Sequence, residues 1–314
     1  MKITVLDGFA VNPGDLDWGI IGQYGELTVY DRTASDEEAI SRIADSEVVM
    51  VNKTPLPAHV LENAPKLKLV CVLATGYNVV DCAAAKRLGI TVCNVPCYGT
   101  AAVAQFSIAL LLELCHHMGR HDVLVHQGAW TSCQDFCLWT TPQMELAGKT
   151  LGIIGYGRIG QATANIGRAL GMEVIAFNRS PKEDVETVSL DELLRRSDVI
   201  SLHCPLFPET ANIISRENIA KMKDGALLIN TARGALMDEQ AVADALAAGK
   251  LRGAAVDVAT VEPMRKDNPL LSAPNCLITP HMAWAPLESR RRLLNTVADN
   301  VRCFLDGNPQ NVVN

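Results

Sequence analysis

The chain has 314 residues, a length at which a single hydrophobic core usually gives way to two domains. Its formal net charge is -7 and it contains no basic block, which argues against nucleic acid as a main partner. Hydrophobic residues make up 48% of the chain, yet no stretch approaches the roughly 20 apolar residues of a membrane span. The first residues read as a short strand rather than a secretory signal, so we expect a cytoplasmic protein that does not enter a membrane.

The cysteines and histidines raise the question of disulfides or a metal site. The ten cysteines include no C-x-x-C pair, and most of them lie within or beside apolar runs, so we expect reduced thiols. His117 and His121 stand one helical turn apart, but no carboxylate follows at a supporting spacing. We therefore predict no metal and interpret the histidines as part of a solvated helix end.

The first hundred residues alternate short apolar runs with helical patterns. Helices are expected over residues 80–88 and from a capping-box start at Ser35 to about residue 43. Strands are expected at residues 3–6, 27–30, 48–51, 69–73 and 91–93. This alternation predicts a small α/β unit with a parallel, flavodoxin-like sheet, and it carries no glycine fingerprint.

The pattern changes at Pro96, which precedes a long apolar helix expected over residues 100–117. We place the first crossover between domains there. Residues 121–146 are rich in Trp, Cys, Thr and Gln without clear periodicity and are expected to be irregular. A long excursion of this kind is usually functional or forms an oligomer arm.

A glycine-rich turn follows, in the stretch Lys-Thr-Leu-Gly-Ile-Ile-Gly-Tyr-Gly-Arg-Ile-Gly at residues 149–160. Gly155 permits a tight turn, Gly157 lets backbone approach a pyrophosphate, and Gly160 lets the next helix pack closely on its strand. The helix start, with Arg158 and Ile159, offers N–H groups and a positive dipole end to phosphates. Because an amphipathic helix and a second strand follow, we predict a dinucleotide site.

The remaining strands complete an open, doubly wound parallel sheet of about six strands. They are expected at residues 151–154, 173–177, 199–202, 226–230, 254–258 and 276–278, with a second capping-box helix starting at Ser189. The last helix, from about residue 286 to 305, is expected to return to the first domain. We thus predict two Rossmann-like domains: a discontinuous substrate domain, 1–97 plus 286–314, and a dinucleotide-binding domain, 98–285.

The end of the second strand of this sheet bears on the choice between NAD and NADP. An NAD site usually has an acid there for the ribose hydroxyls, but this chain has Asn178, Arg179 and Ser180. The Arg179 guanidinium suits a 2′-phosphate, which favours NADP. Alternatively, these residues form an ordinary exposed turn, and the protein binds NAD without an acid to contact its ribose. Loops after later strands should line the same crevice, through His203, Cys204, Pro205, Thr231, Ala232 and Asp257.

Three further polar residues follow apolar strands and should face this crevice: Arg233, Glu262 and His281. Hydride transfer to a 2-oxo acid needs a cation for the carboxylate and a proton donor, roles that suit Arg233 and His281. Glu262 beside His281 would stabilise the imidazolium and fix its ring. Each residue has a plainer alternative, as a surface charge, a solvated acid or a packing histidine.

The chain resembles the D-isomer-specific 2-hydroxyacid dehydrogenases over nearly its whole length. Within that family its sequence motifs are most similar to those of the glycerate dehydrogenases, also called hydroxypyruvate reductases. The matching stretches, in family order and spacing, are Gly-Tyr-Gly-Arg-Ile-Gly at 155–160, His-Cys-Pro-Leu-Phe-Pro-Glu-Thr at 203–210, Asn-Thr-Ala-Arg-Gly at 230–234, Asp-Val-Ala-Thr-Val-Glu-Pro at 257–263 and Thr-Pro-His-Met-Ala-Trp at 279–284.

The resemblance implies Arg233, Glu262 and His281 as the catalytic set, with Asp257 near the nicotinamide carboxamide. It implies cleft walls that include Val103 beside the cofactor, and a small anionic substrate. The substrate-binding residues that it implies are Asn52, Lys53, Ala74, Thr75, Gly76, Tyr77 and Trp284, with the backbone at 74–76 holding the substrate carboxylate. It also implies a homodimer through the nucleotide domain, with residues 121–146 as its arm.

The expected activity is reversible hydride transfer between NAD(P)H and hydroxypyruvate or glyoxylate, giving D-glycerate or glycolate. Two alternatives remain open. One is a reductase of a broader range of 2-oxo acids, and the other is a non-catalytic, dinucleotide-sensing binding protein like the corepressors of the same family.

Overall fold

The computed structural model describes the whole chain, residues 1–314, and it divides into two compact units. One unit consists of Met1–Gly99 and Ala285–Asn314, and the other of Thr100–Trp284. The first unit is discontinuous because the last helix, α11 (Leu287–Leu305), belongs to it.

The first unit is built on a parallel sheet of five strands in the order β2-β1-β3-β4-β5. This is the strand order of flavodoxin-like folds, so the predicted fold of the unit is confirmed. The strands are β1 (Lys2–Val5), β2 (Glu26–Val29), β3 (Val48–Val51), β4 (Leu69–Val72) and β5 (Thr91–Cys93). The interior strands β3 and β4 are buried along their whole length, as expected for strands covered on both faces.

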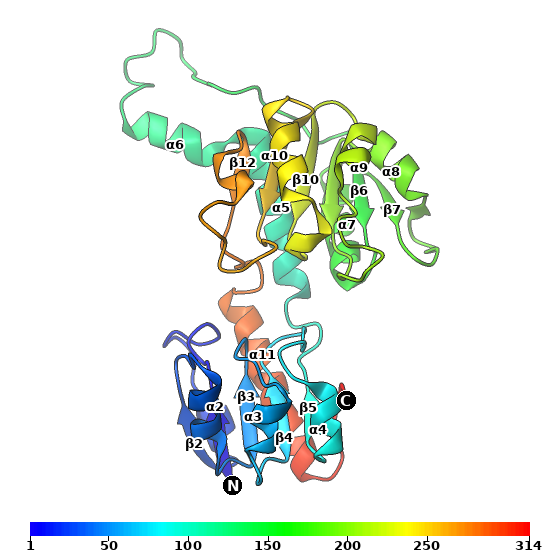
Figure 1. Ribbon diagram of the computed structural model, residues 1–314. Helices are drawn as coiled ribbons and strands as arrows, with labels where there is room; N and C mark the ends of the chain where they lie inside the picture. The colour runs from blue at the N-terminus through cyan, green and yellow to red at the C-terminus, as the bar shows by residue number, and fades with distance from the viewer. The chain divides into compact units, whose positions relative to one another are not determined.

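Helices cover this sheet, with α2 and α3 on one face and α11 on the other (Figure 1). Besides α11 they are α1 (Gly19–Gly22), α2 (Asp36–Ile43), α3 (Ala58–Glu62) and α4 (Cys82–Arg87). The predicted cap of α2 is confirmed, because Ser35 Oγ accepts the Glu38 N–H (3.3 Å). The helix expected over residues 80–88 starts later, where Asp81 Oδ1 accepts the Ala84 N–H (2.8 Å).

Helix α11 is tied to the first unit by a buried arginine. Arg290 donates from both terminal nitrogens to the Asp15 carboxylate (2.7 and 2.6 Å) and from Nη1 to the Val11 carbonyl (3.1 Å). Asn300, fully buried, donates to the Asn94 carbonyl (2.9 Å). A bidentate pair fixes orientation as well as contact, so it holds the C-terminal helix against the first unit.

The second unit is built on a parallel sheet of seven strands in the order β12-β11-β10-β9-β6-β7-β8. The strands are β6 (Thr150–Ile154), β7 (Glu173–Phe177), β8 (Glu186–Thr187), β9 (Val199–Leu202), β10 (Ala226–Asn230), β11 (Leu251–Val256) and β12 (Cys276–Ile278). The doubly wound sheet is confirmed, although the two-residue β8 was not expected. The order reverses between β6 and β9, and ligands of such sheets bind at that point, beyond the carboxyl ends of the strands.

Helices pack on both faces of this sheet (Figure 1). Neighbouring residues of β10 join different buried clusters: Leu228 packs with one, and Leu227 and Ile229 with the other, as expected when side chains alternate across a strand. The helices are α5 (Thr100–His116), α6 (Met118–His126), α7 (Arg158–Ala169), α8 (Leu190–Arg196), α9 (Arg216–Lys221) and α10 (Glu239–Ala247), with short 3₁₀ turns at Gly234–Leu236 and Pro269–Ser272.

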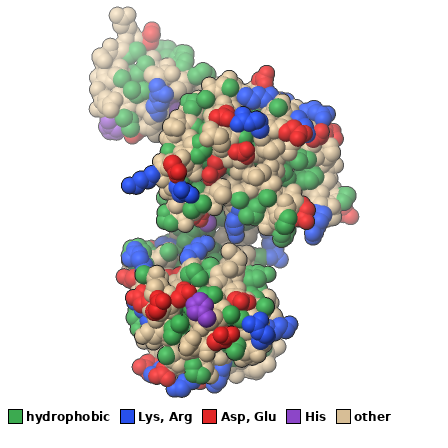
Figure 2. All heavy atoms as spheres, in the orientation of Figure 1, with side chains coloured by type: hydrophobic (Ala, Val, Ile, Leu, Met, Phe, Trp, Pro, Cys, Tyr) green, Lys and Arg blue, Asp and Glu red, His purple; other side chains and the backbone are tan.

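The expectation of an irregular segment from residue 121 was wrong at its start, where α6 continues the chain as a helix to His126. No residue of α6 is buried, so it lacks the apolar stripe by which a helix is recognised in a sequence. Residues 127–149 contain no helix or strand, and the first part of this segment protrudes with α6 from the rest of the second unit (Figure 1), while Leu146 is buried in its core. Hydrophobic side chains lie on the surface of this arm (Figure 2), among them Phe136, which is 91% exposed, and Trp139 at 64%.

By length and apolar composition, no single helix could cross a membrane, although α5 and α6, bent by 56° at their junction, would pass that test together. All ten cysteines are free thiols. Burial raises the pKa of Cys93 and of Cys115 to about 11, which keeps both in the uncharged thiol form at neutral pH.

Candidate active site

The glycine turn between β6 and α7 is shaped by close backbone packing. Gly155 has φ +95°, and a Cβ at this position would lie 2.4 Å from the Cys204 nitrogen. A Cβ at Gly160 would lie 2.3 Å from the carbonyl oxygen of Gly155. Neither site can accept a side chain: Gly155 lets the turn pack against the loop after β9, and Gly160 lets α7 pack against the turn itself.

Gly157 differs, because a Cβ there would meet no atom within 4 Å. Gly157 caps α7, and no side chain accepts a hydrogen bond at that cap. The first turn of a twelve-residue helix therefore presents backbone N–H groups and its positive dipole end to open space. This cradle fits the pyrophosphate of a dinucleotide, with Arg158 and Ile159 as the first helical residues.

The loop after β7 contains no carboxylate at the predicted ribose position. Asn178 folds back onto the glycine turn, since its Oδ1 accepts the Tyr156 N–H (3.1 Å) and its Nδ2 donates to the Ser180 carbonyl (2.9 Å). Arg179 is exposed and has no hydrogen bond or ion pair. The cation is thus available to an anionic ligand at the carboxyl end of β7.

The loop after β9 brings His203, Cys204 and Pro205 beside the glycine turn. His203 is only partly exposed, and its Nε2 lies 2.9 Å from Ser201 Oγ. Burial lowers the pKa of His203 from 6.5 to about 4, so its imidazole is neutral at pH 7. A neutral ring carries no charge that would act on a neighbouring ligand. Because its protonation is disfavoured in the folded state, the ring makes the stability of the fold sensitive to acid.

Stability is expected to fall as the pH decreases from 6.5 towards 4, because the unfolded chain protonates His203 before the folded one does. The depressed pKa corresponds to a loss of about 1–3 kcal/mol across that window. Melting temperatures of the wild type and of His203→Asn, measured without ligand at pH 7 and pH 4, test this. The variant should lose less stability than the wild type, and equal losses would contradict the assignment.

The predicted catalytic acid and its partner are brought together in the second unit. His281 Nδ1 lies 2.6 Å from Glu262 Oε2, and the two side chains are 30% and 35% exposed. Glu262 Oε1 accepts the Ala259 N–H (3.1 Å), which fixes the carboxylate. Because Nδ1 is engaged with Glu262, Nε2 is the ring nitrogen left to exchange a proton with a ligand.

Asp257 holds the loop that carries this histidine. It is 1% exposed, and its Oδ1 accepts from Thr279 Oγ1 (2.7 Å) and the Met282 N–H (2.9 Å), while its Oδ2 accepts the Ala283 N–H (2.8 Å). The sequence indicated a crevice residue here, and the resemblance implied a cofactor contact, which stays a prediction. The structure adds that the carboxylate positions the loop around His281, a role that the sequence did not reveal.

Arg233 stands on a turn that is fixed from below by a buried asparagine. Asn230 is fully buried, its Oδ1 accepts the Ala232 N–H (3.0 Å), and its Nδ2 donates to the Arg233 carbonyl (2.9 Å). The Arg233 side chain is exposed, and Nη1 donates to the Ala232 carbonyl (2.7 Å). It has no acidic partner, so its charge is not neutralised within the chain.

Other residues predicted for this unit lie on the same loops or on α5. Thr231 is nearly buried, and its hydroxyl lies 2.8 Å from that of Ser107. Val103, on α5, is 9% exposed. The Trp284 indole N–H donates to the His281 carbonyl (2.9 Å), which braces the loop that carries His281.

In the first unit, the predicted substrate residues lie at the carboxyl ends of neighbouring strands. The chain after β3 is held by Asp7, whose carboxylate accepts the N–H groups of Asn52, Lys53 and Thr54 (2.6–2.7 Å). The Asn52 amide then donates to the Leu73 carbonyl (2.7 Å). Asp7 was missed, although an acid directly after the first strand was a usable signal.

The loop after β4, residues 74–77, is braced by the end of β5. Thr75 Oγ1 donates to the Val95 carbonyl (2.8 Å), and Asn94 Nδ2 donates to the Thr75 carbonyl (2.7 Å). The side chains of Lys53 and Tyr77 are exposed. The two loops thus form one hydrogen-bonded edge with exposed polar groups.

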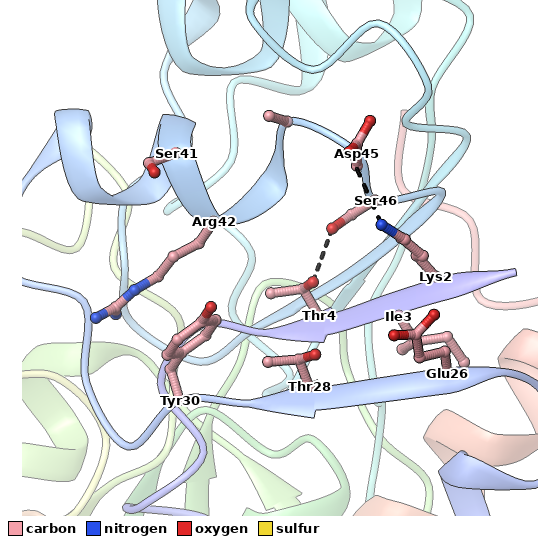
Figure 3. A pocket seen from close by; sticks show the side chains of 11 residues that line it. Lys2, Ile3, Thr4, Glu26, Thr28, Tyr30, Ser41, Arg42, Asp45 and Ser46 are labelled. Carbon is pink, nitrogen blue, oxygen red and sulfur yellow. Dashed lines mark hydrogen bonds and ion pairs between the residues drawn. The ribbon is translucent and has the colours of Figure 1, made fainter.

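A separate polar groove lies at β1, β2 and α2 of the first unit, and no predicted site residue lines it (Figure 3). Three of its four charged side chains are paired: Lys2 lies 3.8 Å from Asp45, and Arg42 binds Glu38 and stacks on Tyr30 at 4.0 Å. Thr4 and Ser46 share a hydrogen bond of 2.7 Å. Since these groups satisfy one another, the groove does not compete with the loops above as the active site.

Comparisons with known proteins bear on these loops. Residues 108–283 match the NAD binding domain of the D-isomer specific 2-hydroxyacid dehydrogenases. A hydroxypyruvate reductase of Blautia hydrogenotrophica is 56% identical over 100% of both chains. A glycerate dehydrogenase of Methylorubrum extorquens is 41% identical over 99% of this chain and 98% of its own.

Among solved structures, an acyclic imino acid reductase in complex with NADPH and D-Arg superposes with a TM-score of 0.86 at 33% identity, covering 100% of both chains. The resemblance of the sequence motifs is thereby confirmed, and the second unit is the nicotinamide-dinucleotide-binding domain. The chain belongs to the D-isomer-specific 2-hydroxyacid dehydrogenase family.

Proposed function

We propose that the protein reduces hydroxypyruvate, and with it glyoxylate, to D-glycerate and glycolate at the expense of NAD(P)H. The observation that carries the proposal is the 2.6 Å contact between His281 and Glu262, on loops that also present Arg233. Relatives 56% and 41% identical over nearly their whole length are a hydroxypyruvate reductase and a glycerate dehydrogenase, which supports this choice of substrate.

The residues divide the chemistry of this reduction. Arg233 and the backbone N–H groups of residues 74–76 bind the carboxylate and orient the oxo group. When bound, the reduced cofactor supplies the hydride that the oxo carbon receives. His281 donates the Nε2 proton to the developing alkoxide oxygen, and Glu262 stabilises the imidazolium that must be present beforehand. Asp257 and Trp284 keep the histidine loop in place.

The substrate assignment is tested by kcat/KM for hydroxypyruvate, glyoxylate and pyruvate, each with NADH and NADPH. Hydroxypyruvate should be the best substrate. Similar values for pyruvate and larger 2-oxo acids would instead identify a broad reductase, in which Lys53, Tyr77 and Trp284 leave more room. Absence of turnover with tight dinucleotide binding would favour a sensing protein.

We propose NADP rather than NAD as the preferred cofactor. An unpaired, exposed Arg179 stands where an NAD site would place an acid, and the Asn178 side chain is engaged with the glycine turn. His203, Cys204, Pro205, Thr231, Ala232 and Val103 are proposed to line the rest of the dinucleotide site.

Replacing Arg179 by alanine is expected to raise the KM for NADPH about tenfold or more and to leave the KM for NADH within twofold, because only NADPH carries the 2′-phosphate. Steady-state kinetics with hydroxypyruvate measure both constants. Arg195→Ala, which removes another exposed arginine on α8, is the matched control. Equal losses for both cofactors would refute the 2′-phosphate contact.

We further propose that the first unit binds the substrate and that the protein is a cytoplasmic homodimer joined through an arm at residues 121–146, which includes most of α6. The arm exposes Trp130, Phe136 and Trp139 without burying any residue of α6, a surface that association with a second copy would cover. Sedimentation of the wild type against a Phe136→Asp, Trp139→Asp variant tests this, and an unchanged mass would exclude the arm.

A further inference from the structure

The loop between β7 and β8, residues 178–185, carries two cations near the proposed cofactor site. Arg179 and Lys182 both have side chains without a hydrogen bond or ion pair. The loop has little regular structure of its own, being bounded by the end of β7 and the two-residue β8. Whether Arg179 can serve a ligand therefore depends on what holds this loop.

Both ends of the loop are bound to one residue, Tyr156. At the start of the loop, Asn178 Oδ1 accepts the Tyr156 backbone N–H (3.1 Å). At its end, the Tyr156 hydroxyl donates to Asp184 Oδ2 (3.0 Å). Tyr156 lies between Gly155 and Gly157, so a single residue of the glycine turn binds the β7–β8 loop, through its backbone N–H at the start of the loop and through its hydroxyl at the end.

The tyrosine is itself fixed. Its side chain is fully buried in the core that includes Ile153, Ala164 and Val185. Arg168, on α7, donates from Nη2 to the Tyr156 hydroxyl (3.2 Å) and to the Asp184 carbonyl (2.9 Å). A buried ring whose hydroxyl makes two hydrogen bonds cannot move without breaking these contacts. The β7–β8 loop is thus hydrogen-bonded to a rigid side chain beside the pyrophosphate cradle.

We infer that Tyr156 is a positioning residue for cofactor selection. Through Asp184 and Asn178 it holds residues 178–184 so that Arg179 stays at the distance from the glycine turn that separates the pyrophosphate of NADP from its 2′-phosphate. The inference rests on the proposed contact between Arg179 and the 2′-phosphate. If Tyr156 served only in packing, its substitution would weaken the binding of NAD and of NADP to the same extent.

The test is Tyr156→Phe, which keeps the ring and removes the hydroxyl. Dissociation constants for NADP⁺ and NAD⁺ are measured by isothermal titration calorimetry, with Tyr24→Phe as the matched control. Loss of one hydrogen bond that orders the loop should weaken NADP⁺ binding by about 2- to 10-fold. Affinity for NAD⁺ should stay within twofold, because its binding does not use Arg179.

A double-mutant cycle with Arg179→Ala separates positioning from packing. If Tyr156 acts through Arg179, Tyr156→Phe should weaken NADP⁺ binding no further in the Arg179→Ala background. Independent, additive losses would overturn the inference, and so would equal losses for the two cofactors. Should Tyr156→Phe fail to fold, Arg168→Met is used instead. It removes the hydrogen bond from Arg168 to the Tyr156 hydroxyl, and it is combined with Arg179→Ala in the same double-mutant cycle.

The cycle also distinguishes the inference from the proposal beneath it. If Arg179→Ala alone leaves the NADP⁺ affinity unchanged, the 2′-phosphate contact is refuted and the inference with it. If Arg179→Ala is selective for NADP⁺ but Tyr156→Phe is not, only the positioning role of Tyr156 is refuted.

Discussion

Replacing His281 by alanine is expected to lower kcat for hydroxypyruvate reduction by ~10² to 10⁴, because the alkoxide would lose its positioned proton donor. The ring is engaged through Nδ1 with Glu262, at 2.6 Å, and so offers Nε2 to the substrate. Its loop is held by Asp257 and not by the imidazole. We therefore expect the loss in kcat with little change in NADP⁺ affinity or melting temperature.

Steady-state kinetics under saturating cofactor measure this effect. His59→Ala, at an exposed histidine that pairs with Asp36 in the first unit, is the matched control and should be fully active. Glu262→Gln keeps a hydrogen-bonding group but removes the charge, and a smaller fall in kcat is expected. An unchanged kcat in His281→Ala would remove the histidine from the proton-donor role.

Local sequence patterns sufficed for the glycine turn because its determinants are neighbours in the chain. An apolar run that ends at Gly155 predicts a strand and a tight turn, and the amphipathic pattern after Gly160 predicts a helix. The close contacts found at both glycines explain why no other residue type serves there. Helix caps at Ser35 and Ser189 were predicted for the same reason, since each depends on a residue three positions away.

Contacts between distant parts of the chain were beyond such patterns. Asp7 binds backbone more than forty positions away, and Tyr156 binds Asp184 from across the sheet edge. A carboxylate or phenol that supports a loop looks in the sequence like any other residue after a strand. The helix α6 was missed for a different reason: its residues are all exposed, and the hydrophobic periodicity that indicates a helix arises from burial.

The predicted catalytic residues lie between these two cases. Positions after apolar strands placed Glu262 and His281 at one edge of the sheet, since carboxyl ends of parallel strands meet there. That argument could not give the contact of their side chains, which depends on the Asp257 hydrogen bonds around the loop. The position of a residue relative to a strand can thus be predicted from the sequence, whereas the orientation of its side chain depends on tertiary contacts.

Replacing Arg233 by alanine is expected to lower kcat/KM for hydroxypyruvate by ~10² to 10³, through a higher KM and a lower kcat. Its guanidinium has no acidic partner in the chain, and Asn230 fixes the turn beneath it. The planar fork can bind a carboxylate through two parallel hydrogen bonds, which a lysine cannot reproduce.

Arg233→Lys should therefore recover only part of the loss, although it restores the charge. Initial rates over a range of hydroxypyruvate concentrations, at saturating NADPH, separate the effects on KM and kcat. Arg195→Ala, at an exposed arginine on α8, controls for the loss of one positive charge. Full activity of Arg233→Lys would mean that charge alone is needed, while an unaffected Arg233→Ala would transfer carboxylate binding to the backbone N–H groups at residues 74–76 and leave Arg233 outside the site.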